Sequence, residues 1–536
     1  MELPQPTHKN YTTLISDIET GQIKIPQFQR DFVWSIERSA ALLDSVIKGY
    51  PIGTFISWRT KERLRSVKKL GNEILPSPKE DEFVTYVLDG QQRLTSLYAA
   101  RKGLEIPRSP RKIDNFGNIY VNLNANDSED IVITDISELD KKTYIRLTDL
   151  LADSDRFAAI FESFPSEHKP KILDYLKLFN EYQFSVIEIK EAPIDIATEI
   201  FTRINVEGKE LTVFEIMVAK TYDEERDFDL SKEYDKLIEK LEQIDYHTIS
   251  KQTILRLVAQ ILKKDSKRQT ILDIEKEVFI QTWPKVVDSI ECAVEHFRNV
   301  IRIPVSRLLP YLDLLVPFAY FFYHHSEQPT AKQAKELENF FWRCSLADRY
   351  SSSVDSKLTQ DIKRVDLILR NKTPDYDWKI DTSAEYLIEN GWFSTGTSFI
   401  KAILCIMAYQ RPLSFNNNGI VRINNDWLKQ SNSKNYHHFF PKAFLKKNGV
   451  DKIFANNILN ITIVDDYLNK REIGAKSPSQ YMKKFKTSNP ELTETMKTHL
   501  IGDLTEFGIW DNDYNTFIHK RAEIISKEIK KRIIVR

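Results

Sequence analysis

Cysteine is scarce in this sequence, and its positions restrict the kind of protein that the sequence can encode. The three cysteines, Cys292, Cys344 and Cys405, are single and far apart, and no CxxC pair occurs. A zinc ribbon needs such pairs, so that class is excluded. Sparse, unpaired cysteine is typical of proteins from a reducing compartment, and we therefore expect a cytoplasmic protein.

Long apolar runs are also missing. The N-terminal residues MELPQPTHKNYTTL contain no apolar core, so we expect no secretion signal. The nearest approach to a membrane span, residues 308–323, contains Asp313 and is too short, which favours a buried helix. We expect no membrane partner.

Internal repeats, low-complexity linkers and the phosphate-binding pattern GxxxxGK[ST] do not occur. A chain of 536 residues is too long for one core and predicts two or three domains. Its 41% apolar and 29% charged residues are those of a soluble globular protein. Without a long linker, the two ends are expected to pack through the middle of the chain.

Charge is balanced overall but unevenly distributed. Residues 419–536 contain 21 Lys and Arg against 13 Asp and Glu, a net charge of +8, so the preceding residues carry −8. Nucleic-acid binding needs a local positive surface, although solvated lysines on ordinary helices would give the same count. The candidate DNA contacts are Lys442, Lys470, Arg471 and Lys476.

A segment near the C-terminus, residues 436–476, carries the strongest chemical signal. His437 and His438 precede Phe-Phe-Pro, Asn460 opens the apolar run ITIV, and Asn469 follows beside Lys-Arg. That order is typical of a ββα-metal (HNH) nuclease, in which few ligands hold one divalent cation on the scissile phosphate. The alternative is an accidental His-His pair, as we expect for His324 and His325, with asparagines that only form turns.

A second candidate site lies near the N-terminus. The apolar run FVTYVL predicts a strand, and it leads through Asp89, Gly90, Gln91, Gln92 and Arg93 into a helical pattern. A strand, a tight turn and a helix N-terminus form a plausible anion cradle, to which Arg93 adds a bidentate donor. Gln29 and Arg30 precede a helix that Ser35 can cap. Arg30 could bind phosphate or form a salt bridge with Asp31 or Glu37.

Both regions resemble the GmrSD-type restriction endonucleases. The N-terminal match rests on IPQFQRDFVW, YPIGTFISW and VLDGQQRLTSLY, and the C-terminal match on residues 436–476. The resemblance implies a ParB/sulfiredoxin-like domain that binds and hydrolyses a nucleoside triphosphate through the DGQQR motif. It further implies that Arg203, Asn205 and Lys209, in FTRINVEGKEL, close on the same pocket. A helix cap and turn around Gly208 is the alternative for those residues.

In the C-terminal domain, the resemblance implies that His438 is the general base and Asn460 the structural asparagine. His437 and Asn469 would then be the metal ligands. The sequence departs from the family at His437, where Asp or Glu is usual. An imidazole is softer than a carboxylate, so Mn²⁺, Ni²⁺ or Co²⁺ become candidates beside Mg²⁺.

The local patterns also predict strands over residues 54–58 and 184–189 and the intervening helices. Helices are expected over residues 1–20, with Tyr11, Leu14, Ile15 and Ile18 on the buried face, and throughout residues 212–370. Breaks between the latter are expected at prolines. These are Pro284, Pro304, Pro310 and Pro329.

Together these observations predict a multidomain α+β protein. The predicted domains are a nucleotide-binding ParB-like domain (1–211), a helical domain (212–400) and an HNH nuclease domain (401–536). The predicted function is nucleotide- and metal-dependent restriction of foreign double-stranded DNA, such as modified phage DNA, by an endonuclease that also has NTPase activity. The alternatives are a nucleotide-gated DNA-binding protein with an inactive HNH fold, or an RNA-directed HNH nuclease. The sequence leaves a homo-oligomer open.

Overall fold

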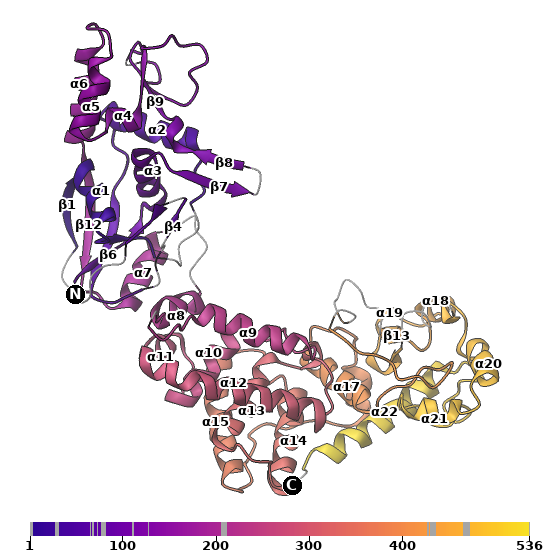
Figure 1. The fold of residues 1–536 in the computed structure, drawn as a ribbon. Helices are drawn as coiled ribbons and strands as arrows, with labels where there is room; N and C mark the ends of the chain where they lie inside the picture. The colour runs from indigo at the N-terminus through magenta and orange to yellow at the C-terminus, as the bar shows by residue number, and fades with distance from the viewer. Residues whose placement is uncertain are drawn as a thin grey trace. The chain divides into compact units, whose positions relative to one another are not determined.

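The computed structural model describes residues 4–26, 32–64, 66, 69–71, 73–76, 82–109, 112–126, 128–204, 212–223, 225–425, 428, 436–464 and 472–534. The chain divides into two compact units, Met1–Leu230 and Ser231–Arg536 (Figure 1). The first unit is built on a mixed sheet and the second is chiefly helical. A multidomain protein of mixed α and β structure is thus confirmed. The predicted domain limits at residues 211 and 400 stay predictions.

A five-stranded sheet forms the centre of the first unit, in the order β1-β12-β3-β6-β2. Its parallel pairs are β12 with β3 and β2 with β6, and the other neighbours are antiparallel. The strands are β1 (Gln5–Asn10), β2 (Ile23–Lys24), β3 (Phe55–Thr60), β6 (Val84–Asp89) and β12 (Gln183–Lys190). Strands β3, β6 and β12 lie where the sequence predicts strands.

The prediction of a helix over residues 1–20 is wrong for its first half. Strand β1 occupies Gln5–Asn10, and helix α1 (Tyr11–Glu19) starts only after it. Asn10 is the N-cap, because its side chain accepts a hydrogen bond from the N–H of Thr13. Pro6 lies in β1, an edge strand, where a residue without an N–H is tolerated. The predicted apolar face of α1 is buried as expected.

Helices and smaller sheets complete the first unit. The helices are α2 (Ile36–Ile47), α3 (Gln91–Lys102), α4 (Leu147–Leu150), α5 (Ser154–Glu162), α6 (Lys169–Glu181), α7 (Ile194–Ile204) and α8 (Val213–Thr221). The strands are β4 (Lys69–Leu70), β5 (Glu73–Ile74), β7 (Glu105–Ser109), β8 (Lys112–Asn115), β9 (Tyr120–Asn122), β10 (Val132–Ile133) and β11 (Tyr144–Arg146). Ser35 caps α2 as predicted, accepting a hydrogen bond from the N–H of Arg38. Apolar residues of α1, α2, α3 and α6 form one core with the sheet.

A buried carboxylate fastens α2 to strand β10. Asp44 is 8% exposed, and its Oδ1 accepts hydrogen bonds from the N–H groups of Ile131 (2.7 Å) and Val132 (3.0 Å). The other oxygen lies 2.7 Å from Lys48 Nζ. Every polar group of this contact therefore has a partner. Removing the carboxylate would take away the acceptor of two backbone N–H groups and the counter-charge of the Lys48 ammonium group.

We expect Asp44→Ala to destabilise the first unit by about 2–4 kcal/mol, because hydrogen bonds to a charged group are worth about 1.5–3 kcal/mol each and are not fully additive. Urea unfolding followed by tryptophan fluorescence measures the loss. Asp130→Ala is the control, since Asp130 is an exposed carboxylate beside the same segment. Equal midpoints for the two variants would contradict the proposed contact.

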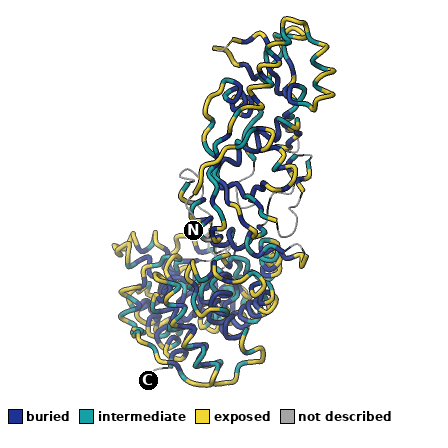
Figure 2. Tube along the Cα trace, turned by 90° about the vertical axis from the view of Figure 1, so that its left-hand side faces the viewer, coloured by how far each residue is buried: buried dark blue, intermediate teal, exposed yellow. Residues whose placement is uncertain are grey.

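The second unit is a helical assembly with a short strand pair at the C-terminal side. Its helices begin with α9 (Leu230–Glu242), α10 (Lys251–Lys263), α11 (Arg268–Leu272), α12 (Lys276–Asn299), α13 (Leu315–His324), α14 (Ala331–Leu346) and α15 (Val354–Leu369). They continue with α16 (Ala384–Glu389), α17 (Ser398–Tyr409), α18 (Lys442–Lys447), α19 (Lys452–Ala455), α20 (Pro478–Ser488), α21 (Leu492–Lys497) and α22 (Tyr514–Arg532). Helix α13 packs against α10, α12 and α15, and α22 packs against α14, α16 and α17. Buried residues concentrate inside this assembly (Figure 2).

Pro284 does not end a helix, contrary to the prediction from the sequence. It lies inside α12, which continues to Asn299. A proline inside a helix costs about 3 kcal/mol. The residues on the buried face of α12, among them Trp283, Val286 and Ile290, supply more than that through burial. Tertiary packing therefore outweighs the tendency of Pro284 to end the helix.

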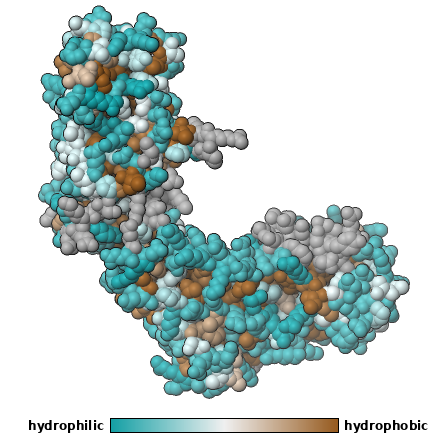
Figure 3. Space-filling view, in the orientation of Figure 1, coloured by the Kyte–Doolittle hydropathy of each residue, from teal (hydrophilic) through white to brown (hydrophobic). Residues whose placement is uncertain are grey.

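Within the described part of the chain, no helix has both the length and the hydropathy that crossing a membrane requires. Residues 308–323, the most apolar run, form short 3₁₀ turns and the buried helix α13. The surface seen in Figure 3 is largely hydrophilic, with hydrophobic residues scattered over it. The three cysteines are free thiols.

Candidate active site

The histidine pair lies on the first of two short antiparallel strands. Strand β13 (Tyr436–His438) pairs with β14 (Ile461–Ile463), which sets His437 opposite Thr462 and His438 opposite Ile461. A 3₁₀ turn, η5 (Ile458–Asn460), leads directly into β14. The apolar run that follows Asn460 thus forms a strand, and His438 lies at the end of β13.

Asn460 connects the end of β13 to the start of β14. It is completely buried. Its Oδ1 accepts a hydrogen bond from the N–H of Phe440 at 2.8 Å. Its Nδ2 donates to the carbonyls of Phe440 (3.0 Å) and Ala455 (3.1 Å), and its own carbonyl accepts from the N–H of Phe439 at 2.7 Å. The oxygen and the nitrogen of the Asn460 side-chain amide thus both have hydrogen-bond partners. These hydrogen bonds fix the backbone that follows His438.

His438 lies at the edge of this arrangement, partly exposed. Its Nε2 is 3.0 Å from Asn456 Oδ1, and the Phe393 ring meets the imidazole edge-on, with centroids 6.3 Å apart. Burial and, to a smaller extent, the positive charge of Lys442 lower the pKa of His438 to about 4, against the opposing effect of the Asn456 hydrogen bond. The imidazole is therefore neutral at pH 7, and one of its two ring nitrogens has a lone pair.

His437 has different neighbours from His438. Successive side chains of a strand point to opposite faces, and His437 is only 3% exposed. Its Nδ1 is 3.4 Å from Thr462 Oγ1, and its ring lies edge-on to Tyr481 of α20. Burial, followed by the neighbouring His438 and His499, lowers the pKa of His437 to about 3. This imidazole is neutral as well, which is the form that binds metal.

The described donors fit a divalent cation in chemical type but do not complete a site. A neutral His437 can supply one nitrogen ligand, and Asn469, the second predicted ligand, lies outside the described residues. Among the described residues, no group of three His, Cys, Asp or Glu side chains is placed to hold a metal ion. The predicted metal ligands therefore stay predictions.

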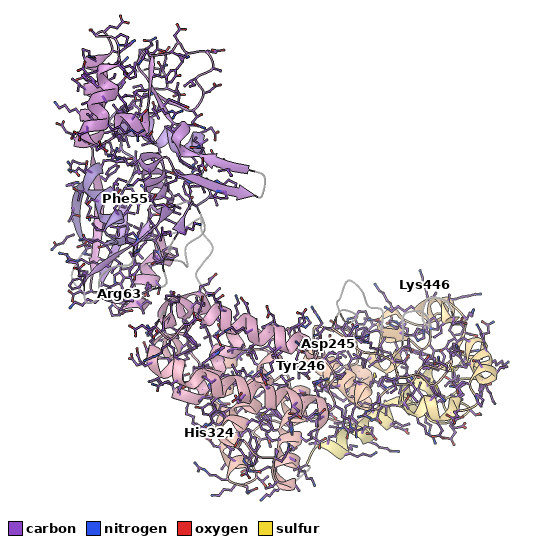
Figure 4. The ribbon with its side chains drawn as sticks, in the orientation of Figure 1. Phe55, Arg63, Asp245, Tyr246, His324 and Lys446 are labelled. Carbon is purple, nitrogen blue, oxygen red and sulfur yellow. The ribbon has the colours of Figure 1, made fainter. Side chains whose placement is uncertain are left out.

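Exposed lysines lie on the segments near His438 in the sequence, and the positive charge of Lys442 acts on His438 itself. Lys442 begins α18 and is exposed, and Lys476 is exposed with its Nζ 2.8 Å from the Glu472 carbonyl. Lys470 and Arg471 lie outside the described residues. The sequence analysis missed further exposed lysines in the same region, namely Lys446, Lys447 and Lys452. Figure 4 marks Lys446 on α18 at the outer edge of the unit. The helical spacing of Lys442 and Lys446 is the signal that would have revealed this group.

Two supporting residues have no motif signal in the sequence. Asn456 contacts His438, and Arg521 of α22 is completely buried behind the turn η5. Arg521 donates to the carbonyls of Leu459 (2.7 Å) and His499 (3.0 Å). Burial lowers the pKa of its guanidinium to about 9, although the group stays charged at pH 7. Arg521 thus holds the residue before Asn460.

The DGQQR motif in the first unit forms the corner between β6 and α3, as predicted. Gly90 has φ +93°, and an added Cβ would lie 2.5 Å from the Phe55 ring, so glycine is required there. Figure 4 marks Phe55 within this unit. Gln91 and Gln92 are buried, and the Asp89 side chain is about one third exposed.

Two motif side chains hold neighbouring loops. Arg93 Nη1 donates to the Ile52 carbonyl (2.6 Å), while Nη2 donates to the Thr54 carbonyl (3.0 Å) and to Asp89 Oδ2 (3.1 Å). Gln92 Oε1 accepts from the N–H of Val33 at 2.9 Å. The motif therefore fastens three chain segments together, and the Arg93 guanidinium is engaged with protein oxygens.

Most of the other predicted nucleotide contacts lie outside the residues that the structure describes. Gln29, Arg30, Asn205 and Lys209 lie outside the described residues. Arg203, at the end of α7, has a largely exposed side chain and forms an ion pair with Glu199 at 2.6 Å. Of the predicted nucleotide contacts, the structure describes Asp89, Gly90, Gln91, Gln92 and Arg93 together at the corner between β6 and α3, and Arg203 separately at the end of α7.

Comparison with known proteins gives one family match and one full-length relative. Residues 11–222 match the family model of the GmrSD restriction endonuclease, N-terminal domain. This match covers about two fifths of the chain and supports a relationship of its N-terminal part to the GmrSD-type restriction endonucleases. The chain is also similar to the uncharacterized protein MJ0686 of Methanocaldococcus jannaschii, with 25% identity over 99% of both chains.

We expect Asn460→Ala to destabilise the second unit by about 3–5 kcal/mol, because it leaves a buried N–H and two buried carbonyls without partners, each costing about 1–3 kcal/mol. Thermal unfolding measures the change. Asn448→Ala is the control, since Asn448 is exposed and its Nδ2 donates to only one carbonyl, that of Phe444. If both variants unfold at the wild-type temperature, Asn460 does not hold the turn.

Proposed function

We propose that this chain is an HNH endonuclease that needs a divalent metal ion, is controlled by a nucleoside triphosphate that it also hydrolyses, and restricts foreign, modified DNA. The observation that carries the proposal is the pair β13–β14. A neutral, partly exposed His438 stands at its edge, and the fully bonded Asn460 fixes the adjoining backbone. The match of residues 11–222 to a restriction endonuclease domain supports DNA as the substrate.

In this proposal His438 is the general base. Its lone pair accepts a proton from water, whose oxygen attacks the phosphorus as the bond to the 3′-oxygen breaks. His437 and Asn469 would hold the divalent cation, which supplies charge stabilisation to the phosphate and the departing oxygen. The exposed lysines around Lys442 bind the DNA phosphates and bring the strand to His438.

The position of His437 favours one alternative. It faces Tyr481 and Thr462 while His438 faces Asn456, so among the residues that the structure describes the two side chains have no partner in common. A site in which this difference prevents metal binding would be an inactive HNH fold in a nucleotide-gated DNA-binding protein. Activity measurements separate the two functions.

We expect His438→Ala to lower the rate of DNA cleavage by about two to four orders of magnitude, because a general base contributes about that much. Rates are measured on modified and unmodified duplex DNA and on RNA, with Mg²⁺, Mn²⁺, Ni²⁺ or Co²⁺, and with or without nucleotide. His324→Ala is the matched control, since His324 belongs to the other His-His pair.

Cleavage by His438→Ala at the wild-type rate would rule out His438 as the base. A wild-type protein that binds DNA but cuts no substrate with any of the metals would establish the inactive fold. Preferential cutting of RNA would establish the third function.

The first unit is proposed to bind the nucleotide at the corner of the DGQQR motif. The N-terminus of α3 offers the positive end of a helix dipole, and Arg93 adds a positive charge beside it. The guanidinium would have to exchange part of its contact with Asp89 or the loop carbonyls for phosphate oxygens. Such an exchange would couple nucleotide binding to the conformation of the 52–54 loop.

We expect Arg93→Ala to weaken triphosphate binding roughly ten- to hundredfold and to remove the nucleotide dependence of cleavage, because it deletes a charge-assisted donor worth about 1.5–3 kcal/mol. Calorimetric titration with ATP and GTP, together with cleavage rates against nucleotide concentration, gives both values. Arg146→Ala, an exposed arginine of the same unit, is the control. Loss of stability with unchanged nucleotide affinity would make Arg93 only a structural link.

A further inference from the structure

Asn456 occupies a fixed position beside His438. It ends helix α19, is 7% exposed, and its backbone carbonyl accepts a hydrogen bond from the N–H of Phe393 at 2.8 Å. One residue on, Trp392 and Asn457 form a β-bridge, and the N–H of Ile458 donates to the Gly391 carbonyl at 2.6 Å. The segments 391–393 and 456–458 are therefore held together by backbone hydrogen bonds, independently of any side chain at position 456.

The orientation of the Asn456 amide follows from its partners. On one side lies the Phe393 carbonyl, 3.1 Å from the side-chain nitrogen Nδ2. A carbonyl oxygen can only accept, so the NH₂ group must face it and Oδ1 must face the other way. On that other side, Oδ1 is 3.0 Å from His438 Nε2. An amide oxygen can only accept, so His438 Nε2 must carry the hydrogen.

These two hydrogen bonds determine which ring nitrogen of His438 can accept a proton. A neutral imidazole has one N–H and one lone pair, so a hydrogen on Nε2 leaves the lone pair on Nδ1. The Phe393 ring, edge-on to the imidazole, and the bond to Asn456 also restrict rotation of the ring. Without the acceptor at position 456, both tautomers would be populated and the basic nitrogen would no longer have a fixed place.

We propose that Asn456 is a positioning residue that holds His438 in the Nε2–H tautomer, so that Nδ1 is the atom that takes the proton from the attacking water. The inference rests on the proposed nuclease function. The proton moves to Nδ1, the water oxygen bonds to phosphorus, the bond to the 3′-oxygen breaks, and the departing oxygen takes a proton from solvent. Oδ1 of Asn456 continues to accept from Nε2–H throughout, so the ring need not turn.

The direct test reads the tautomer by NMR. Full-length protein labelled with ¹⁵N-histidine is measured at pH 7 without added metal, and the His438 signals are assigned by their loss in His438→Gln. We expect the shift of a protonated nitrogen for Nε2 and that of an unprotonated nitrogen for Nδ1. The opposite assignment, or averaged shifts for both nitrogens in the wild-type protein, would overturn the proposal whatever the cleavage activity.

Variants at position 456 test the consequence for catalysis. Asn456→Leu keeps a similar volume but lacks the acceptor, and we expect averaged shifts and a kcat about 10- to 100-fold lower, with an unchanged KM. Asn456→Asp keeps the acceptor for Nε2–H but loses the donor to the Phe393 carbonyl, so it should keep the Nε2–H signature and recover part of the rate. Asn448→Leu, at an exposed asparagine of the same region, is the control and should leave both unchanged.

The outcomes for the two proposals can be told apart. Asn456→Leu with the wild-type tautomer and kcat would overturn the positioning role. A wild-type protein with the predicted tautomer that cuts no nucleic acid contradicts the nuclease function alone and retains Asn456 as the residue that sets the tautomer.

Discussion

The candidate active site depends on one buried amide. Asn460 has no contact with water, so each of its polar atoms and each backbone group that it meets needs a partner inside the protein. Its side chain supplies these partners for Phe440 and Ala455 at once, and thereby fixes the turn in which β13 leads to α18. Because His438 is two residues before Phe440, the same turn fixes its position. Arg521 secures the opposite side by binding the Leu459 carbonyl.

Burial also sets the protonation of the site. Both histidines are neutral at pH 7, because a charged imidazole would lose its hydration inside the protein. Neutral imidazole is the form that can accept a proton or bind a metal ion, so the same burial serves both proposed roles. The positive charge of Lys442 adds to the lowering of the His438 pKa.

The DGQQR corner has a structural role that does not depend on a ligand. Gly90 allows close approach to Phe55, while Gln92 and Arg93 bind the backbone of two loops. These contacts explain why the corner needs those residue types even without a ligand. In the proposed function, a phosphate would have to compete with these protein oxygens for the Arg93 guanidinium, and the 52–54 loop is therefore where we propose that a response to nucleotide begins.

The sequence by itself determined the local elements: the strands β3, β6 and β12, the cap at Ser35, the helical pattern over residues 212–370, and the order of His438 and Asn460 around β14. Each depends on neighbouring residues, whose periodicity and capping chemistry are readable in the chain. Tertiary structure alone decided that residues 5–10 pair with β12, that α12 continues through Pro284, and that Asn456 and Arg521 support the site. Those outcomes depend on partners distant along the chain, and the burial of the two histidines likewise exists only once the helices have packed around them.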